Sequence, residues 1–324
     1  MRCPTLSDLP PPPPGKTGWP WTEECPQLPD TRSDGSAWPR ISIVTPSYNQ
    51  GQFIEETIRS ILLQGYPKLE YIIMDGGSTD ESLEIIRKYA PWFNYWQSKP
   101  DAGQAAAISE GVSLSHGCII HWINSDDFLL KGALKIVAEL GVDGNSIAAT
   151  AVVNFRDGNF ADSRIVENSN LSLSDWCKGK MQFHQPGVWL HRTAWDSASR
   201  AWLSCSHAFD VFLLFEILTT SVVVRTTSEA TVCFRLHNDS KTVSQSGRFS
   251  FDMRILIAHA LRTEKFGPWR RCFTRARKAI ALRRLISIRA RRKRWIFLPI
   301  AALLRLEPSI SNLRYSIGAL RRAW

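Results

Sequence analysis

The fold is set by a stretch near the start of the chain, Ile41 to Asn49, which reads ISIVTPSYN. A short run rich in β-branched residues that ends at Pro46 is typical of a strand entering a loop. Apolar residues then recur at helical spacing from Phe53 to Leu62, and Gly65 lies just past them. We therefore expect a strand, a loop and a helix as the first repeat of the fold.

The same pattern continues along the chain. We expect strands at 69–74, 93–97 and 118–123, each preceded by a helix, the second and third helices spanning 79–89 and 103–115. Strands that are apolar on both faces and alternate with helices predict an α/β fold with a mostly parallel sheet flanked by helices. Further strands are expected at 147–155, 187–191, 221–225 and 231–236, and a helix at 209–218.

The chain has 324 residues, of which 44% are apolar, enough for one large domain with appendages. Residues 1–38 form a proline-rich arm that we expect to pack through Trp19 and Trp21. Residues 39–245 form the α/β domain, and residues 246–324 form a basic, helical C-terminal extension.

The net charge of +10 is concentrated at the C-terminal end of the chain. Residues 262–324 hold 18 of the 40 Lys and Arg residues and only two of the 30 acids, which gives about +16 there and about −6 elsewhere. A basic segment with interleaved apolar residues is typical of attachment to an anionic membrane surface. A solvated helix packed on the body is the alternative. Nucleic acid is disfavoured as a partner because no nucleic-acid-binding motif accompanies the charge.

Seven scattered cysteines without a CxxC pair indicate reduced thiols in a cytosolic compartment. No apolar signal-peptide core follows Met1, and the longest apolar run, residues 295–304, is too short to span a bilayer. We expect a cytoplasmic protein, and its peripheral attachment to the inner face of the plasma membrane is a further hypothesis.

Polar residues follow the expected strands where ligands bind in parallel sheets. Asn124-Ser125-Asp126-Asp127 could supply oxygen ligands to Mg²⁺ or Mn²⁺, although the two acids could also merely cap the next helix. In Asp75-Gly76-Gly77-Ser78-Thr79-Asp80 the glycines allow a ligand to approach the backbone, and Ser78 or Thr79 could cap a helix. Neither GxGxxG nor a P-loop motif occurs, which argues against dinucleotide oxidoreductases and P-loop enzymes.

Together, Thr45–Asn49, Asp75–Asp80, Asp101–Gln104 and Trp122–Asp127 resemble the family 2 glycosyltransferases in order, spacing and placement, over roughly residues 40–245. The resemblance implies a GT-A fold, a nucleotide-diphosphate sugar donor, a divalent cation (Mn²⁺ or Mg²⁺) and inversion at the anomeric carbon. It also implies a hexosyltransferase-like enzyme of surface or extracellular polysaccharide synthesis, whose acceptor is a glycan or a lipid-linked saccharide.

Carried over residue by residue, the resemblance implies two sets of ligands. The nucleotide-sugar site comprises Thr45, Pro46, Tyr48, Asn49, Asp75, Asp101, Gly103, Gln104, Asn124, Asp127 and Gln185. The metal site comprises Asp126 and His237. In the family's acid-any-acid metal motif, Asn124 stands at the first acid and Asp126 at the second.

The resemblance also implies that Asp210 is the base for the acceptor hydroxyl, with Phe212 at a second place that is acidic in relatives. Without the family, Asp210 could simply favour the positive end of its helix. Ala106 and Ser109 stand where close relatives carry His and Asn. These departures leave open a catalytically weakened nucleotide-sugar-binding protein of the same fold. The basic tail leaves open a second alternative, a polyanion-binding protein that acts through this tail.

Overall fold

The computed structural model describes residues 1–156, 159–237 and 246–292. The chain divides into two compact units. The first comprises Met1–Asn168, His184–Ala198 and Val222–His237, and the second comprises Ser169–Phe183, Ser199–Ser221 and the chain from Asn238 onward. The second unit thus combines parts of the predicted α/β domain with the predicted extension, and the boundary after residue 245 stays a prediction.

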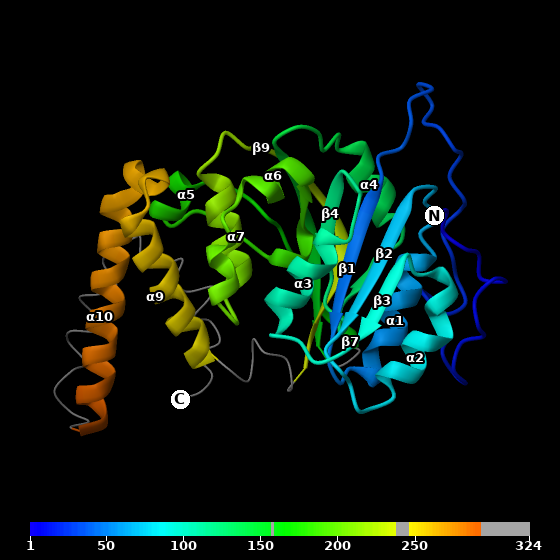
Figure 1. Cartoon of the computed structure of the whole chain (residues 1–324), viewed down its shortest axis with the longest axis horizontal. Coiled ribbons are helices and arrows are strands. Elements are labelled where there is room, and N and C mark those ends of the chain that lie inside the picture. The colour runs from blue at the N-terminus through cyan, green and yellow to red at the C-terminus, as the bar shows by residue number, and fades with distance from the viewer. Residues whose placement is uncertain (157–158, 238–245, 293–324) are drawn as a thin grey trace. The chain divides into compact units, whose positions relative to one another are not determined.

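The first unit is built on a sheet whose strand order is β3-β2-β1-β4-β8-β6-β9-β5. Figure 1 shows β3, β2, β1 and β4 side by side. Strand β1 (Ile41–Ser47) is parallel to β2 (Leu69–Asp75) and to β4 (Ile119–Trp122), and β3 (Tyr95–Ser98) is parallel to β2. These strands confirm the predicted parallel arrangement. The carboxyl ends of β1 and β2 coincide, because Ser47 is the register partner of Asp75.

The other half of the sheet is mixed. Strand β8 (Val188–His191) is antiparallel to β4 and to β6 (Ser146–Arg156), and β9 (Val223–Leu236) returns parallel to β6. The short β5 (Phe128–Leu129) and β7 (Asn159–Val166) pair antiparallel with β9 and β6.

The two strands predicted at 221–225 and 231–236 are one strand, so that prediction is wrong. The register of β9 against β6 shifts between Thr226 and Ala230. The residues between the two predicted segments therefore form an irregularity within a continuous strand.

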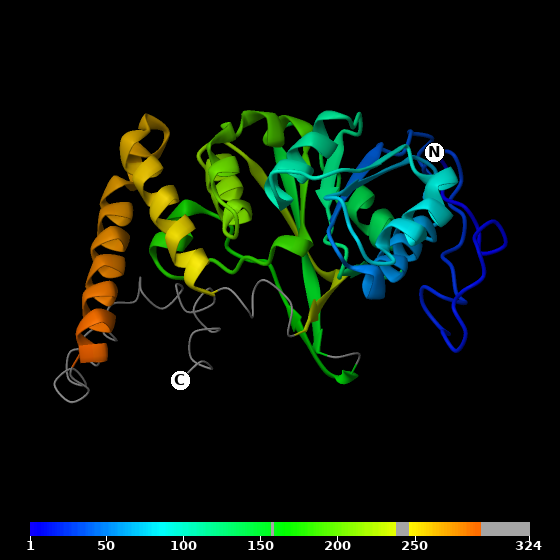
Figure 2. The same ribbon diagram turned by 60° about the horizontal axis from the view of Figure 1, so that its bottom comes forward.

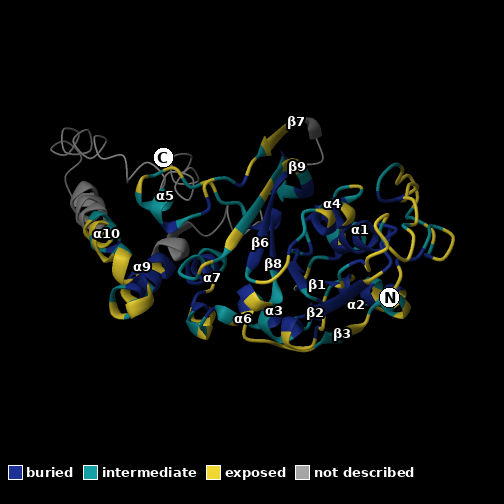
Figure 3. Ribbon diagram, turned by 90° about the horizontal axis from the view of Figure 1, so that it is seen from above, coloured by how far each residue is buried: buried dark blue, intermediate teal, exposed yellow. Residues whose placement is uncertain are grey.

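Helices cover both faces of the parallel strands (Figure 2). Ile54 and Ile58 of α1 (Gly51–Leu62) share a core cluster with Ile43 and Ile73, which point to one face of the sheet. On the opposite face, Gly111 of α3 (Gln104–Ser113) lies so close to the Val44 side chain that a Cβ would approach it to 2.6 Å. Alternation along each strand therefore gives the two helices different faces, and the strands between them are buried (Figure 3).

The remaining helices of the first unit are α2 (Ser82–Tyr89), α4 (Ala133–Glu139) and α6 (Arg192–Ser197), with 3-10 turns at Ala90–Trp92 and Gln185–Gly187.

The second unit has an aromatic core. It contains α5 (Leu173–Cys177), α7 (Phe209–Leu218), α9 (Ser246–Arg262) and α10 (Arg270–Arg292), with 3-10 turns at Arg200–Ser204 and Glu264–Trp269. The ring of Trp176 lies 5.0 Å from those of Phe215 and Phe273, and Phe273 lies 5.4 Å from Phe266. The start of α10 is therefore anchored in this core. Within the described ranges, no helix combines the length and apolar character needed to cross a bilayer.

The N-terminal arm is held on the first unit by a fully buried arginine. The guanidinium of Arg59 on α1 donates to the carbonyl oxygens of Pro10, Pro20 and Trp21 at 2.8 to 3.1 Å. It also donates to the hydroxyl of Tyr89 at 3.0 Å. The arm packs through its tryptophans as predicted: Trp21 is 6% exposed, and the Trp19 indole N–H donates to the Leu129 carbonyl oxygen.

Replacing Arg59 should detach the arm. Arg59→Ala leaves buried carbonyl oxygens without donors, and hydrogen bonds to charged groups contribute about 1.5–3 kcal/mol each. We expect the free energy of unfolding to fall by about 3 kcal/mol or more, measured by urea denaturation. Arg87→Ala, on the exposed side of α2, is the matched control and should change it by less than about 0.5 kcal/mol. Equal stabilities of the two variants would contradict the anchoring role of Arg59.

Candidate functional site

The candidate site lies in the first unit, at the edge where β1, β2 and β4 end. Asp75 is the last residue of β2 and is only 1% exposed. Its Oδ2 accepts hydrogen bonds from the N–H groups of Gly77 and Ser78 and from the Ser98 hydroxyl, and its Oδ1 accepts one from the Ser78 hydroxyl. Asp75 therefore fixes the turn after β2 and links it to the end of β3.

Asn49 joins the loop after β1 to the same turn. It takes a left-handed backbone conformation, with φ of 51°. Its N–H donates to the Ser78 hydroxyl oxygen, and its side-chain oxygen accepts the Thr79 N–H, both at 2.8 Å. The helix predicted from residue 79 begins instead at Ser82, and neither Ser78 nor Thr79 caps it. Ser78 and Thr79 instead connect the turn after β2 to the loop after β1.

Tyr48, Gly76 and Asp101 come together beside this turn. A Cβ at Gly76 would lie 3.2 Å from Asp101 Oδ2 and 3.4 Å from Tyr48 Cδ2. Tyr48 is 61% exposed, and Asp101 Oδ1 accepts the N–H of Gly103, whose φ is 103°. An exposed aromatic ring beside a glycine and a carboxylate could stack a flat base and accept hydrogen bonds from a ribose.

Three predicted nucleotide ligands face inward instead. Thr45 is fully buried and its hydroxyl lies 3.2 Å from that of Tyr71. Pro46 is buried, and the Gln185 side chain donates to the Trp122 carbonyl oxygen at 3.1 Å. These three residues pack inside the protein near the strand ends. Their direct contact with a nucleotide stays a prediction.

A chain of polar side chains leads to the carboxylates after β4. The Gln104 amide donates to Asn124 Oδ1 at 2.6 Å, and the Asn124 amide donates to Asp127 Oδ2 at 3.2 Å. Asp127 is 1% exposed. Its burial and, next, the neighbouring carboxylate of Asp126 raise the pKa of Asp127 well above its usual value. Asp127 therefore belongs to the support of this loop, and Asp126 is the more accessible carboxylate.

The end of β9 completes this cluster. His237 Nε2 lies 3.0 Å from Asp126 Oδ2, so the structure brings the two predicted metal ligands together. Two residues earlier, the N–H of Arg235 donates to Asp127 Oδ1 and its Nε donates to the Asp126 carbonyl oxygen. Its guanidinium also pairs with Glu56 of α1 at 2.7 Å.

The Arg235–Glu56 pair was not predicted. No motif of the sequence singles out Glu56, and 179 positions separate it from its partner. The only sequence feature that could have drawn attention to Arg235 is its position two residues before the candidate ligand His237.

The cluster fits a hard cation that shares its coordination with a ligand. Among the residues that the structure describes, no group of three or more His, Cys, Asp or Glu side chains could hold a metal. Mg²⁺ in phosphate-handling sites typically takes one or two carboxylates and completes its shell with phosphate oxygens and water. The Asp126 carboxylate meets this requirement. The His237 ring carries a buried Nδ1 without a hydrogen-bond partner among the described residues.

Asp210 belongs to the second unit. It lies in the first turn of α7, half-buried, and its Oδ1 accepts the Val211 N–H at 2.8 Å. Burial is the main cause that raises the pKa of Asp210 to about 6, and the charge of Asp252 adds a smaller increase. Such a carboxylate can accept a proton near neutral pH. Phe212, at the place that is acidic in relatives, is fully buried with its ring 5.0 Å from that of His259.

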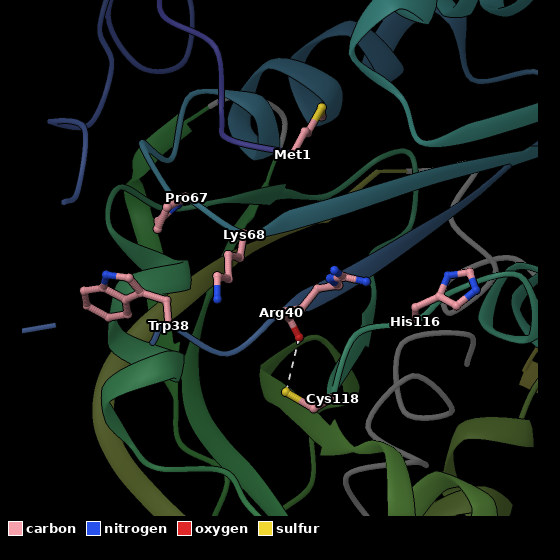
Figure 4. A pocket seen from close by; sticks show the side chains of 7 residues that line it. All are labelled: Met1, Trp38, Arg40, Pro67, Lys68, His116 and Cys118. Carbon is pink, nitrogen blue, oxygen red and sulfur yellow. Dashed lines mark hydrogen bonds between the residues drawn. The ribbon is translucent and has the colours of Figure 1, made fainter. Parts of the chain in front are cut away.

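A pocket of about 340 Å³ opens at the opposite edge of the sheet (Figure 4). Arg40, Lys68 and Cys118 on its wall directly precede β1, β2 and β4. It is also lined by Met1, Trp38, Pro67 and His116. It therefore lies at the amino ends of the parallel strands, away from the candidate site.

Comparisons with known proteins point to one family. Residues 42–197 match the model of Glycosyl transferase family 2. The chain is 29% identical over 148 residues to the poly(ribitol-phosphate) beta-N-acetylglucosaminyltransferase TarP of Staphylococcus aureus (strain N315), covering 40% of this chain and 45% of TarP. It spans less than half the length of the curated relatives that it matches.

Two solved structures have a similar fold. TarS of Staphylococcus aureus in complex with UDP-GlcNAc aligns with a TM-score of 0.55 and 17% identity, covering 69% of this chain and 67% of the TarS chain. The mannosyltransferase PcManGT of Pyrobaculum calidifontis, in complex with GDP-Man and Mn²⁺, aligns with a TM-score of 0.56 and 18% identity, covering 93% and 90% of the two chains. They confirm the predicted α/β fold of the GT-A type. With the family match, they support a family 2 glycosyltransferase.

Proposed function

We propose that this chain is a family 2 glycosyltransferase that transfers one sugar, with inversion, from a nucleotide-diphosphate sugar to an acceptor hydroxyl. The observation that carries the proposal is the cluster of Asp126, Asp127 and His237, at the same edge of the sheet as the exposed Tyr48 and Asp101. A diphosphate needs a site for a cation, and a nucleoside needs a flat surface and acceptors for its hydroxyls. The match to TarP, a poly(ribitol-phosphate) beta-N-acetylglucosaminyltransferase, favours an acceptor in polysaccharide synthesis, and we infer a surface or extracellular polysaccharide.

In this mechanism Asp210 is the base. Its carboxylate takes the proton of the acceptor hydroxyl while that oxygen bonds to the anomeric carbon and the bond from this carbon to the diphosphate oxygen breaks. A divalent cation, Mn²⁺ or Mg²⁺, held by Asp126 and His237, would neutralise the negative charge of the leaving diphosphate. Asp127, Asn124 and Arg235 hold the Asp126 loop in position through the hydrogen bonds described above.

Removing the proposed metal ligand should abolish metal-dependent nucleotide binding. We expect Asp126→Ala to bind UDP and GDP equally weakly with and without Mn²⁺ in isothermal titration, because the side chain supplies the cation's protein oxygen. Asp143→Ala is the matched control, since that acid is exposed and pairs only with Arg225 among the described residues. If Asp126→Ala keeps the Mn²⁺-dependent affinity, the metal assignment is wrong.

The proposed base should give an acid limb in the pH profile. Proton acceptance requires the ionised form, so the single-turnover rate should fall as the pH drops through about 6, the raised pKa of Asp210. Asp210→Asn should lower the rate about 100-fold or more and leave donor binding intact, because an amide accepts no proton. Asp196→Asn, an exposed acid on α6, should leave the rate unchanged. Near-normal turnover in Asp210→Asn would place the base elsewhere.

We also propose that the basic segment attaches the protein to the inner, anionic face of the plasma membrane. Its helix α10 exposes Arg271, Arg275, Arg277 and Lys278. None of these four pairs with an acid among the described residues. Each Lys or Arg near an anionic surface contributes about 1 kcal/mol. Attachment would confine the enzyme to the plane of a lipid-linked acceptor. Residues 293–324 of the predicted segment lie outside the described residues.

Charge reversal is a better test of attachment than truncation, because removing α10 would also remove the buried Phe273. We expect Arg271→Glu/Arg275→Glu/Lys278→Glu to lose co-sedimentation with phosphatidylserine-containing vesicles at low salt. Lys68→Glu/Arg87→Glu/Lys135→Glu changes the net charge equally and should still bind. Vesicles of phosphatidylcholine alone should bind neither variant. If the wild-type protein ignores anionic vesicles at low salt, the attachment proposal fails.

A further inference from the structure

The loop that precedes α7 is organised by a single carboxylate from a different helix. Oδ2 of Asp252, on α9, accepts the N–H groups of three consecutive residues, Ser206, His207 and Ala208, at 2.8, 2.6 and 3.0 Å. Asp252 is 2% exposed, and the thiol of Cys205 lies 3.8 Å from its carbonyl oxygen. All these residues belong to the second unit.

Helix α7 has no cap of its own. The N-cap residue is Ala208, which offers no side-chain acceptor, and the N–H groups at the start of a helix need acceptors from outside it. Consecutive N–H groups that point to one centre form a concave site for an anion. Asp252 fills that site from within the protein, and therefore fixes the backbone two residues before Asp210.

Helix α9 holds α7 at a second point. His259 lies seven positions after Asp252 on α9, and its Nε2 is 2.7 Å from Oε1 of the fully buried Glu216 near the end of α7. Between the two contacts, the ring of Phe212 packs against the His259 ring. Asp252 and His259 therefore connect α9 to both ends of α7.

We propose that Asp252 is a positioning residue for Asp210, acting by ordering the 206–208 loop and by placing a fixed negative charge near the base. The inference rests on the proposed function, in which Asp210 takes the acceptor's proton. Among the described residues, the titratable groups that interact with Asp210 are Asp252 on α9 and the Cys205 thiol in the preceding loop.

Two substitutions separate the effects of order and charge. Asp252→Ala leaves three N–H groups without an acceptor, so the loop loses its anchor. Asp252→Asn keeps an oxygen that can accept them but removes the charge. Loss of a nearby negative charge makes ionisation of Asp210 easier, so the pKa of Asp210 should fall and the acid limb should move to lower pH.

The test uses the full-length protein with Mn²⁺ and whichever of UDP-GlcNAc and GDP-mannose it turns over or hydrolyses. We expect Asp252→Ala to lower the single-turnover rate about tenfold or more without changing the dissociation constant for the nucleotide, because misplacing a reacting group by about 1 Å can cost 100-fold. In Asp252→Asn the rate above the acid limb should recover toward the wild type. Its Asp210 titration, followed by ¹³C NMR of the carboxyl group assigned with Asp210→Asn, should shift to lower pH.

An unchanged titration of Asp210 in Asp252→Asn, or an unchanged rate in a folded Asp252→Ala, would overturn the inference. A purely structural residue would lower the melting temperature without moving the titration. If Asp252→Ala does not fold, Asp252→Asn and its titration still decide the question. The proposed function fails separately: normal turnover in Asp210→Asn would reject Asp210 as the base, whatever the Asp252 variants do.

Discussion

The hydrogen bond from the Arg235 N–H to the Asp127 carboxylate, 2.9 Å long, determines how the first unit assembles its site. It joins the loop after β4 to the end of β9, two segments that are about a hundred residues apart. Because side chains alternate along a strand, the same geometry that directs Arg235 to this loop also directs His237 to it, two residues later. Arg235 then reaches Glu56, so α1, β4 and β9 meet at one cluster of charges.

This arrangement carries an electrostatic cost. Asp127 is buried beside Asp126, and two carboxylates at close range in a low-dielectric interior oppose each other's ionisation. Arg235 and the amide of Asn124 offset part of that repulsion. A cation bound at Asp126, as proposed above, would relieve more of it.

The parts of the molecule that could be predicted from sequence are those determined by local pattern. Strands β1, β2 and β4 were identifiable because they are largely apolar and buried along their whole length, and α7 matched its prediction at residues 209–218. The prediction for β9 failed because a polar irregularity within a strand looks like a turn. In the site, strand ends were predictable, since parallel strands finish at one edge. Contacts made across the fold were not predictable. Glu56 and Arg235 are far apart in the sequence, as are Asp252 and the loop before α7, and no local pattern pairs them. Ser78 looked like a cap but joins two loops.

The hydrogen bonds from Arg59 to the arm have a consequence for the order in which the chain can fold. Pro10, Pro20 and Trp21 are synthesised before Arg59, and their carbonyl oxygens gain this donor only when α1 has formed. During synthesis these carbonyl oxygens therefore lack the Arg59 donor until α1 has formed. The arm can form these hydrogen bonds only after the first strand-helix repeat is complete. A nascent chain that stops short of α1 would leave this proline-rich, tryptophan-bearing segment available to chaperones.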